Sequence, residues 1–507
     1  MSKPMTEHID NRDNVEDLNN SAVQHDRERG QAATDKSGQS LAEYDPATER
    51  KLRLKIDFCI IPIVSLIFMF CFIDRANIGN AKIAGLDTDL KMTGYDYNVV
   101  ISVFYISYIL FEIPANLLCK WMGPGWFLPT TTLLFGLTSL GTAFVTTMPQ
   151  LSGVRFLLGI FEAGILPGIA YYLSRWYRRA ELVFRFGLYI VMAPLAGAFG
   201  GLLASAILSF DHFGSLQRWR MIFAVEGIIT IALALISFAV LTDRPATARW
   251  LSEKEKNLAI ARVESERIGT AVLDKMDTTK LLRGVLSPIT LSTSFVCLLT
   301  NITVQGLAFF LPTIIRTIYL QKTTVQQQLY TVPPYMVGVF FTLLFSLISW
   351  RIDRRQILFI LCAPMCMVGF CMFLGSENSA VRYGATFLVA SCCFALGPLT
   401  NAQVSANVIS DTARNAAIST NAMMGNIGGL ISAWSFLPWD APNYHIGNGL
   451  NLATSGGILI LSTLTLLWMK RDNKRKDNEE MYDTLSGMTQ QEIEDLDWKH
   501  PAFRWQL

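Results

Sequence analysis

Two pairs of charged residues stand inside strongly apolar stretches of this sequence. Asp74 and Arg75 occur in FIDRANIGN (72–80), and Arg155 and Glu162 occur in RFLLGIFEAG (155–164). Ionisable side chains at bilayer depth cost several kcal/mol, so they usually face a partner, water or a ligand. These four residues are therefore the first candidates for chemistry.

Helix geometry limits how the four side chains can interact. Asp74 and Arg75 project about 100° apart, so they cannot simply neutralise one another and each needs a partner elsewhere. A spacing of seven places Arg155 and Glu162 on one helix face, roughly 10 Å apart. That face therefore presents both signs of charge.

The residue types indicate a proton and an anion as ligands. Burial disfavours an ionised carboxyl group and a nearby guanidinium favours it, so Asp74 and Glu162 are candidates for proton coupling. Arginine stays charged and its planar fork matches a carboxylate, which makes Arg75 the natural anion anchor and Arg155 a second candidate for substrate binding. The alternative is that all four form ion pairs that only lock helices together.

Amide side chains form a second set of candidates. Four of them could give a cavity a polar lining that orients a substrate: Asn301, Gln305, Asn401 and Asn421. Asn and Gln also join helices by hydrogen bonds, so both interpretations stay open. Glu112, Glu226 and Arg316 are interpreted as structural, with Glu226 paired to a base in a loop.

Composition excludes several classes of protein. Only 17% of the 507 residues are charged and 51% are hydrophobic, whereas a soluble protein carries about 25% charged residues. A net charge of +2 in short clusters argues against nucleic-acid binding. The nine cysteines lack metal-site spacing and are interpreted as apolar packing residues. With no nucleophile–base pair or metal cluster either, we expect neither an enzyme nor a cofactor or metal.

The elements that must position the candidates are membrane-spanning helices of roughly 20 residues. The apolar runs predict twelve of them, at about 56–83, 97–119, 125–145, 149–173, 183–208, 219–241, 289–316, 330–350, 356–375, 380–402, 414–437 and 446–469. The prediction is an all-α polytopic membrane protein. The predicted layout begins with a disordered tail (1–50) and a six-helix bundle (51–241). It continues with a linker (242–286), a second six-helix bundle (287–470) and a second tail (471–507). Two such halves are typical of secondary transporters.

Lysine and arginine in short loops predict the orientation. Basic residues precede the first span and follow the second, fourth, eighth and twelfth, which are all on one side: Lys51, Arg53, Lys55, Lys120, Arg175, Arg178, Arg179, Arg351, Arg354, Arg355, Lys470, Arg471, Lys474, Arg475 and Lys476. The opposite loops are poorer in bases, although Arg218 and Arg220 are exceptions. We expect both termini to be cytoplasmic, most simply in the plasma membrane.

Several motifs resemble a known family. DRANIGNA (74–81), FEIPAN (111–116), RWY (175–177) and APNY (441–444) are similar to the fungal anion:cation symporter family of the major facilitator superfamily, which includes allantoate, nicotinate, pantothenate and biotin permeases. The resemblance covers about 50–475 and implies the major facilitator fold. The loop after the second span departs from the superfamily's usual glycine- and aspartate-containing signature, because it reads NLLCKWMGP (116–124).

The resemblance also implies roles. Asp74 and Glu162 would exchange protons, Arg75 would meet the substrate carboxylate, and Arg155 would tune Glu162. We expect a monomer in the lipid bilayer that imports a small organic anion, nicotinate-like or another monocarboxylate, with protons by alternating access. An exporter working by proton exchange and a nutrient sensor without transport are the alternatives.

Overall fold

Every regular element in the described part of the chain is a helix. The computed structural model describes residues 46–177, 179–210, 218–267, 278–352, 354–408, 411–477, 498 and 503–506. The chain divides into two units, Met1–Lys55 and Ile56–Leu507. The first unit is described only from Pro46, where helix α2 begins. The predicted tail (1–50) is therefore helical in its last five residues, and residues 1–45 lie outside the described part.

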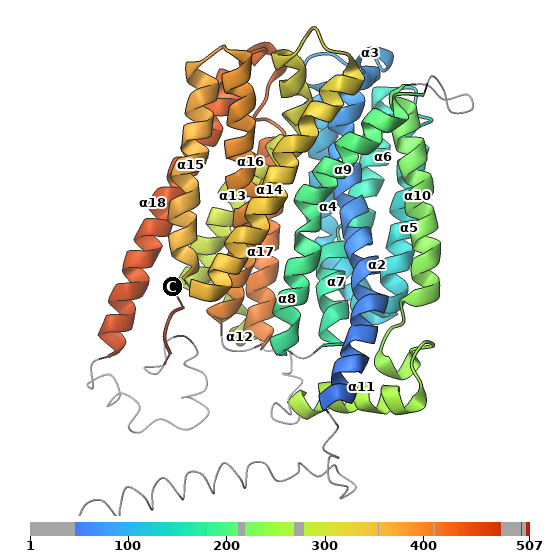
Figure 1. Ribbon diagram of the computed structural model, residues 1–507, viewed down its shortest axis with the longest axis vertical. Coiled ribbons are helices and arrows are strands. Elements are labelled where there is room, and N and C mark those ends of the chain that lie inside the picture. Colours follow the sequence, from blue (N-terminus) through green and yellow to red (C-terminus); the bar gives the residue numbers. More distant parts are fainter. Residues whose placement is uncertain are drawn as a thin grey trace, which may run out of the picture. The chain divides into compact units, whose positions relative to one another are not determined.

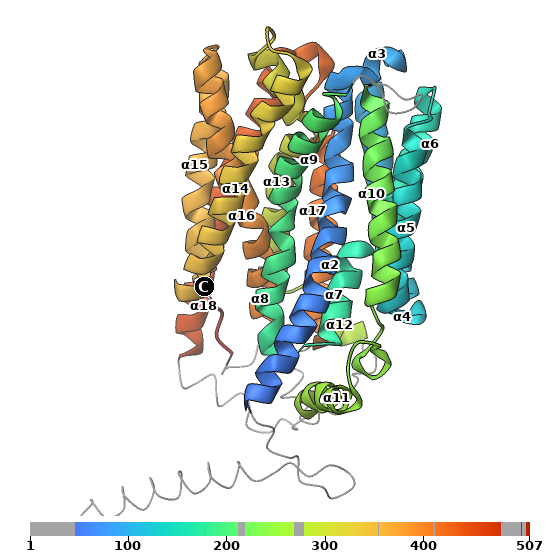
Figure 2. The same ribbon diagram turned by 45° about the vertical axis from the view of Figure 1, so that its right-hand side comes forward.

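The first ten helical elements form what we call the N-terminal group. They are α2 (Pro46–Ala81), the π-helix η1 (Lys82–Leu86), α3 (Asp87–Asp89), α4 (Asp96–Met122), α5 (Pro124–Thr142), α6 (Met148–Glu162), α7 (Ile165–Ser174), α8 (Arg179–Ile190), α9 (Met192–Ile207) and α10 (Trp219–Val240). Helix α5 packs against α10 and α6, and α4 packs against α6. Figure 2 shows α5, α6 and α10 side by side.

The last six long helices form the C-terminal group. The elements from η2 onwards are η2 (Pro245–Thr247), α11 (Glu253–Arg267), α12 (Thr278–Val285), α13 (Pro288–Ile318), α14 (Thr324–Ile352), α15 (Arg355–Gly375), α16 (Ser379–Ala406), α17 (Asp411–Ser432), η4 (Pro438–Asp440) and α18 (His445–Lys476). The group comprises α13 to α18. Helix α13 packs on α17, α14 on α16, and α15 on both α16 and α18.

Prolines break two of the predicted spans. Proline lacks an N–H donor, and its ring clashes with the carbonyl four residues earlier. Pro167 accordingly ends α6 near Ala163, and Pro194 ends α8 at Ile190. Glu162 is thus the last residue of α6, directly at a break in the fourth span.

All twelve predicted spans are helical. Ten helical segments of the described residues are long and apolar enough to cross a membrane. The other two predicted spans, α5 and α17, are outside that set because threonine, serine and asparagine dilute their apolar residues. Both nevertheless pack within the bundle, α5 on α10 and α17 on α13. These contacts account for their lower hydropathy, since a helix covered by protein needs less apolar surface than one facing lipid.

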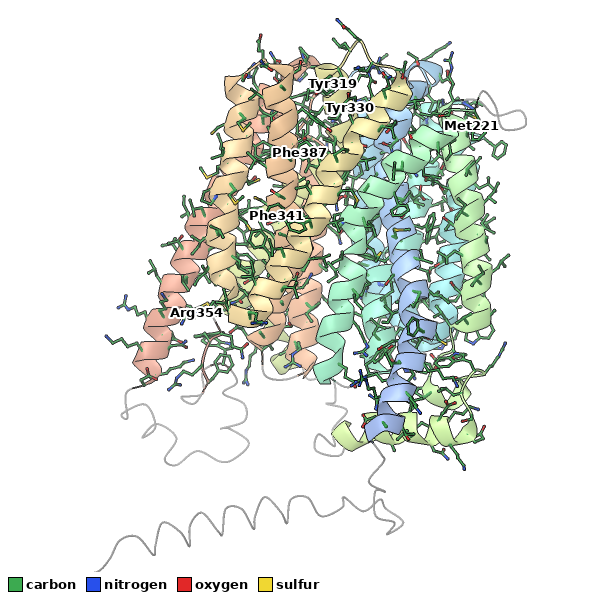
Figure 3. The ribbon with its side chains drawn as sticks, in the orientation of Figure 1. Met221, Tyr319, Tyr330, Phe341, Arg354 and Phe387 are labelled. Carbon is green, nitrogen blue, oxygen red and sulfur yellow. The ribbon has the colours of Figure 1, made fainter. Side chains whose placement is uncertain are left out.

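The two ends of the bundle differ in their side chains. Figure 1 shows α3, next to η1, at one end and α11 and α12 at the other; we call them the η1 end and the α11 end. In Figure 3 the labelled Tyr319 and Tyr330 lie near the η1 end and Arg354 lies toward the α11 end. The two tyrosine rings stack with centroids 4.7 Å apart. Tyrosine and arginine at helix ends are typical of membrane–water interfaces.

Contacts between the two groups gather toward the η1 end. In the described residues, three hydrogen bonds to backbone carbonyls connect them, from Tyr97 Oη to Phe309 (3.1 Å), from Asn98 Nδ2 to Ala433 (2.6 Å) and from Gln328 Nε2 to Asn80 (3.2 Å). Two bonds between side chains add to them, from Trp434 Nε1 to Ser102 Oγ (2.9 Å) and, farther along α4, from Asn426 Nδ2 to Glu112 Oε2 (3.3 Å). Gly79 adds to this contact, since a Cβ there would lie 2.5 Å from the Phe309 carbonyl oxygen. Only glycine lets the backbones approach this closely.

Residues 503–506 of the predicted second tail pack against the C-terminal group. Trp505 is 2% exposed and packs against Ile289 and Met469. The backbone N–H of Gln506 donates to Asn407 Oδ1 at 2.8 Å, and its carbonyl accepts from Gln403 Nε2 at 2.9 Å. Within the predicted second tail (471–507), these contacts hold residues 503–506 against the C-terminal group at its α11 end.

Candidate functional site

The structure brings the four charged candidates together inside the N-terminal group. Asp74, Arg75, Arg155 and Glu162 are 4%, 5%, 3% and 0% exposed. Arg75 Nε donates to Glu162 Oε2 at 2.7 Å and joins α2 to α6. Ser139 Oγ of α5 donates to Asp74 Oδ1 at 3.0 Å. Each member of the Asp74–Arg75 pair therefore finds its partner on a different helix.

Arg155 is incompletely paired in this arrangement. Its Nη1 donates to the backbone carbonyl of Asp74 at 3.4 Å, whereas Nε and Nη2 are buried without a hydrogen-bond partner. Its guanidinium lies 5.5 Å from the centre of the Phe223 ring of α10. Electrostatic interactions connect it to Asp74 and Glu162. Two guanidinium nitrogens thus remain available to an acceptor. Buried donors that make no hydrogen bond cost free energy.

Aromatic rings and one thiol enclose Arg75. Its guanidinium carbon lies 5.0, 5.4 and 4.8 Å from the ring centres of Phe72, Phe104 and Tyr108, where the ring faces attract a cation. Cys71 Sγ donates to Glu162 Oε2 at 3.2 Å and accepts from Arg75 Nη2 at 3.4 Å. The interpretation of every cysteine as an apolar packing residue is therefore wrong for Cys71.

Close packing of α6 against α4 determines the position of Glu162. A Cβ on Gly159 would overlap Ser107 Oγ and the carbonyl oxygen of Phe104 on α4. Glycine at this position lets α6 lie against α4. Since Glu162 follows less than one turn later, this contact sets its position relative to Arg75.

Each carboxyl group keeps at least one oxygen without a partner. Asp74 Oδ2 and Glu162 Oε1 are buried and unbonded, and so are both oxygens of Glu226 on α10. Glu226 was expected to pair with a base in a loop. That expectation is wrong, because its electrostatic interactions are with Asp74 and Arg155 inside the bundle.

The amide candidates divide into two kinds. Asn421 Nδ2 donates to Asn401 Oδ1 at 2.8 Å and so joins α17 to α16. Asn301 Nδ2 donates to the carbonyl of Cys297 within its own helix at 3.0 Å. Gln305 is 4% exposed and its Oε1 has no hydrogen-bond partner. Within the described residues, none of the four is hydrogen-bonded to the charged residues of α2 and α6.

Tyr105 links the charged cluster to the C-terminal group. Its buried hydroxyl has no hydrogen-bond partner, and it interacts electrostatically with Arg75. A Cβ on Gly429 of α17 would lie 2.7 Å from that hydroxyl. Neither Tyr105 nor Ser139 could be selected from the sequence, because single tyrosines and serines in apolar helices carry no distinguishing pattern.

The described residues contain no group of three or more His, Cys, Asp and Glu side chains that could hold a metal ion. The chemistry of the cluster lies in its carboxyl, guanidinium, hydroxyl and thiol groups. Such groups can bind and release protons and can bind an anion by charge-assisted hydrogen bonds.

Comparisons with known proteins place the chain in a family. Residues 64–433 match the model of the Major Facilitator Superfamily. An uncharacterized transporter of Schizosaccharomyces pombe is 33% identical over 469 residues, which cover 91% of both chains. The high-affinity nicotinic acid transporter of Saccharomyces cerevisiae is 30% identical over 453 residues, or 89% of this chain and 83% of that one.

A solved structure shows the same fold. A bacterial homologue of the human lysosomal transporter Spinster, in an inward-facing and unoccupied conformation, aligns with a TM-score of 0.61 and 14% identity. The match covers 80% of this chain and 94% of the other. The predictions of an all-helical membrane protein with the major facilitator fold, and of a transporter rather than an enzyme, are confirmed. The chain belongs to the Major Facilitator Superfamily and is a secondary transporter.

Proposed function

We propose that this transporter imports a small organic anion together with protons by alternating access. The observation that supports the proposal best is the buried ion pair between Arg75 and Glu162, with Arg155 holding two unbonded guanidinium nitrogens beside it. A cluster that contains both an occupied and an incompletely paired arginine can rearrange when a proton or an anion enters. A cluster in which every charged group was fully paired would have no unbonded guanidinium nitrogen for such a rearrangement.

Charge balance gives the coupling. While Glu162 is ionised it occupies the Arg75 guanidinium. A proton on Glu162 removes this competition, so Arg75 can bind the carboxylate of a substrate. Anion binding and protonation therefore favour one another, and a ligand of this kind shifts a conformational equilibrium through its different affinity for the two states. Asp74 serves as the second proton site beside Arg155.

The substrate class is proposed from similarity and chemistry together. The chain shares 30% identity over most of its length with a high-affinity nicotinic acid transporter. An aromatic monocarboxylate would suit a guanidinium surrounded by Phe72, Phe104 and Tyr108. In the C-terminal group Asn301 and Gln305 lie four residues apart on one face of α13, where they can orient the uncharged part of the substrate. Asn421 donates to Asn401, and this pair is better explained as a helix–helix bond.

The proposed mechanism uses the predicted two six-helix halves (51–241 and 287–470), joined by the linker (242–286). Hydrogen bonds between the groups near the η1 end support a conformation closed at that end. With the predicted cytoplasmic termini, the η1 end faces outside. The described state is then the one from which substrate leaves to the cytoplasm.

Uptake of labelled carboxylates into proteoliposomes under an inward proton gradient tests the proposal. The panel contains nicotinate, pantothenate, biotin and allantoate. The wild-type protein should accumulate at least one of them, and a protonophore should abolish the accumulation. Arg75→Ala and Glu162→Gln should each abolish it as well. Arg244→Ala, which changes an arginine 59% exposed outside the membrane helices, is the matched control and should transport normally.

Other outcomes would point elsewhere. Expulsion of a hydrophobic acid from loaded vesicles without accumulation of any anion would contradict import and favour an exporter. Saturable binding without transport in either direction would favour a sensor. Normal accumulation in Glu162→Gln would show that the Arg75–Glu162 pair is only a helix lock.

A further inference from the structure

Glu226 is a buried acid that the proposed mechanism does not use. It lies in the first half of α10 and is 2% exposed. Neither of its carboxyl oxygens has a hydrogen-bond partner in the described part of the chain. An ionised carboxylate left without hydrogen bonds in the protein interior is strongly disfavoured. Its position therefore requires an explanation other than packing.

The packing of α10 places Glu226 next to the charged cluster, which we define as Asp74, Arg75, Arg155 and Glu162 with the groups that interact with them. Gly227, the next residue, brings α10 so close to α5 that a Cβ would lie 2.6 Å from the backbone nitrogen of Leu140. Ser139, the neighbour of Leu140, donates to Asp74. Phe223, about one turn earlier on α10, lies against the Arg155 guanidinium. The α10 surface that carries Glu226 is thus the wall of the cluster on the side of α5 and α6.

Few charged groups face Glu226. Helix α10 packs against α5, α9 and η1. The sequences of α5 and α9 contain no ionisable side chain. Lys82 of η1 lies 3.9 Å from the centre of the Tyr97 ring. Asp74 and Arg155 are the charged groups with which Glu226 interacts.

Glu112 of α4 is also buried, interacts with Arg75 and accepts a hydrogen bond from Asn426. The cluster therefore holds four acids and two bases. Glu162 bonds to Arg75 and Cys71, and Asp74 bonds to Ser139, whereas Glu226 bonds to nothing in this arrangement. Two guanidinium groups can balance only two carboxylates. The acids beyond these two must be neutral for the buried cluster to be balanced, and Glu226, the one without hydrogen bonds, gains least from being ionised.

We infer that Glu226 is a third proton-exchanging group of the transporter, which rests on the proposed proton coupling. In the described conformation Glu226 holds the proton, and Arg155 keeps two nitrogens unbonded. When Glu226 releases the proton, Arg155 gains a new carboxylate partner on α10 and its hold on the α2 backbone weakens. The proton moves between the carboxyl oxygen of Glu226 and water in the open state, so the charge of the cluster changes by one.

Infrared difference spectroscopy tests this without any substrate. At neutral pH the purified wild-type protein should show the carbonyl stretch of a protonated carboxyl group, shifted by exchange into heavy water. Glu226→Gln should lose intensity in this band. Asp57→Asn, which changes a carboxylate paired with Arg185, should keep it. A band that persists unchanged in Glu226→Gln would overturn the inference, whatever the protein transports.

Transport measurements give the second readout. Glu226→Gln should lose accumulation driven by the proton gradient and should still exchange labelled for unlabelled anion across the membrane, because exchange needs no net proton movement. Glu226→Asp should restore accumulation at least in part, since it restores the titratable group. A purely structural role would be assigned to Glu226 by a different result. In that case Glu226→Gln would elute as a folded monomer but lose both accumulation and exchange, and Glu226→Asp would restore neither. Failure of the wild-type protein to accumulate any anion would contradict the proposed function and leave the infrared result to decide the inference.

Discussion

Removing one partner of the Arg75–Glu162 pair should destabilise the protein more than removing both. The two side chains are 6% and 0% exposed, and their charged atoms lie 2.7 Å apart. Their attraction is about 6 kcal/mol at an effective dielectric constant of about 20. Desolvation of both ions opposes this attraction, so the pair itself adds little net stability.

Single and double variants separate these two effects. Arg75→Gln or Glu162→Gln leaves an unpaired buried charge, which costs about 3–5 kcal/mol. The double variant Arg75→Gln/Glu162→Gln leaves no charge and should be more stable than either single variant, with a coupling of about 2–3 kcal/mol. The free energy of unfolding can be measured by titrating SDS into detergent micelles and recording tryptophan fluorescence.

An exposed pair provides the comparison. Lys256 and Glu253 lie 2.9 Å apart on α11, but the glutamate side chain is 82% exposed, so the same substitutions there should cost only about 0.3 kcal/mol. The reasoning would be refuted if the losses of Arg75→Gln and Glu162→Gln simply added in the double variant. It would also be refuted if both single variants matched the wild-type protein within about 0.5 kcal/mol.

Three further predictions concern packing and conformation. Gly159→Ala should destabilise the protein by about 1–3 kcal/mol, because the methyl group overlaps α4, whereas Gly153→Ala on the same helix faces open space and should be neutral in the same unfolding assay. Trp505→Ala should lower the apparent melting temperature by removing a buried ring, and an equal loss in the 61%-exposed control Trp439→Ala would contradict the docking of residues 503–506. Cysteines introduced at Asn98 and Ala433, which are hydrogen-bonded across the two groups, should block uptake when oxidised and restore it when reduced. Equal inhibition of either single-cysteine variant would argue against this contact.

The sequence predicted the helices better than their contacts. Hydropathy placed twelve spans, including the less apolar α5 and α17, because loops and polar connections bounded them. It also selected Asp74, Arg75, Arg155 and Glu162, since charge within apolar runs is a strong signal. Which acid meets which base depends on the rotation and approach of neighbouring helices. The pairing of Arg75 with Glu162, rather than an interaction of Glu162 with Arg155 on its own helix, therefore had to come from the structure.

Residues with ordinary side chains were missed for a related reason. Cys71, Ser139 and Tyr105 look like packing residues until the neighbouring helix is known. Glu226 was noticed, but its partner was sought in a loop because the position of α10 against α5 was unknown. The docking of Trp505 was missed because the surrounding tail is polar in composition, and because its partners Asp472, Met469 and Ile289 are more than 30 positions away.

Proton movement caused by the substrate tests the central claim most directly. Proteoliposomes containing a trapped pH-sensitive dye, at equal pH inside and outside, would receive the anion identified in the uptake panel. Coupled import predicts acidification of the lumen by the wild-type protein beyond that of empty liposomes, and none by Glu162→Gln. Anion accumulation without a change in luminal pH, or with alkalinisation, would contradict proton-coupled import.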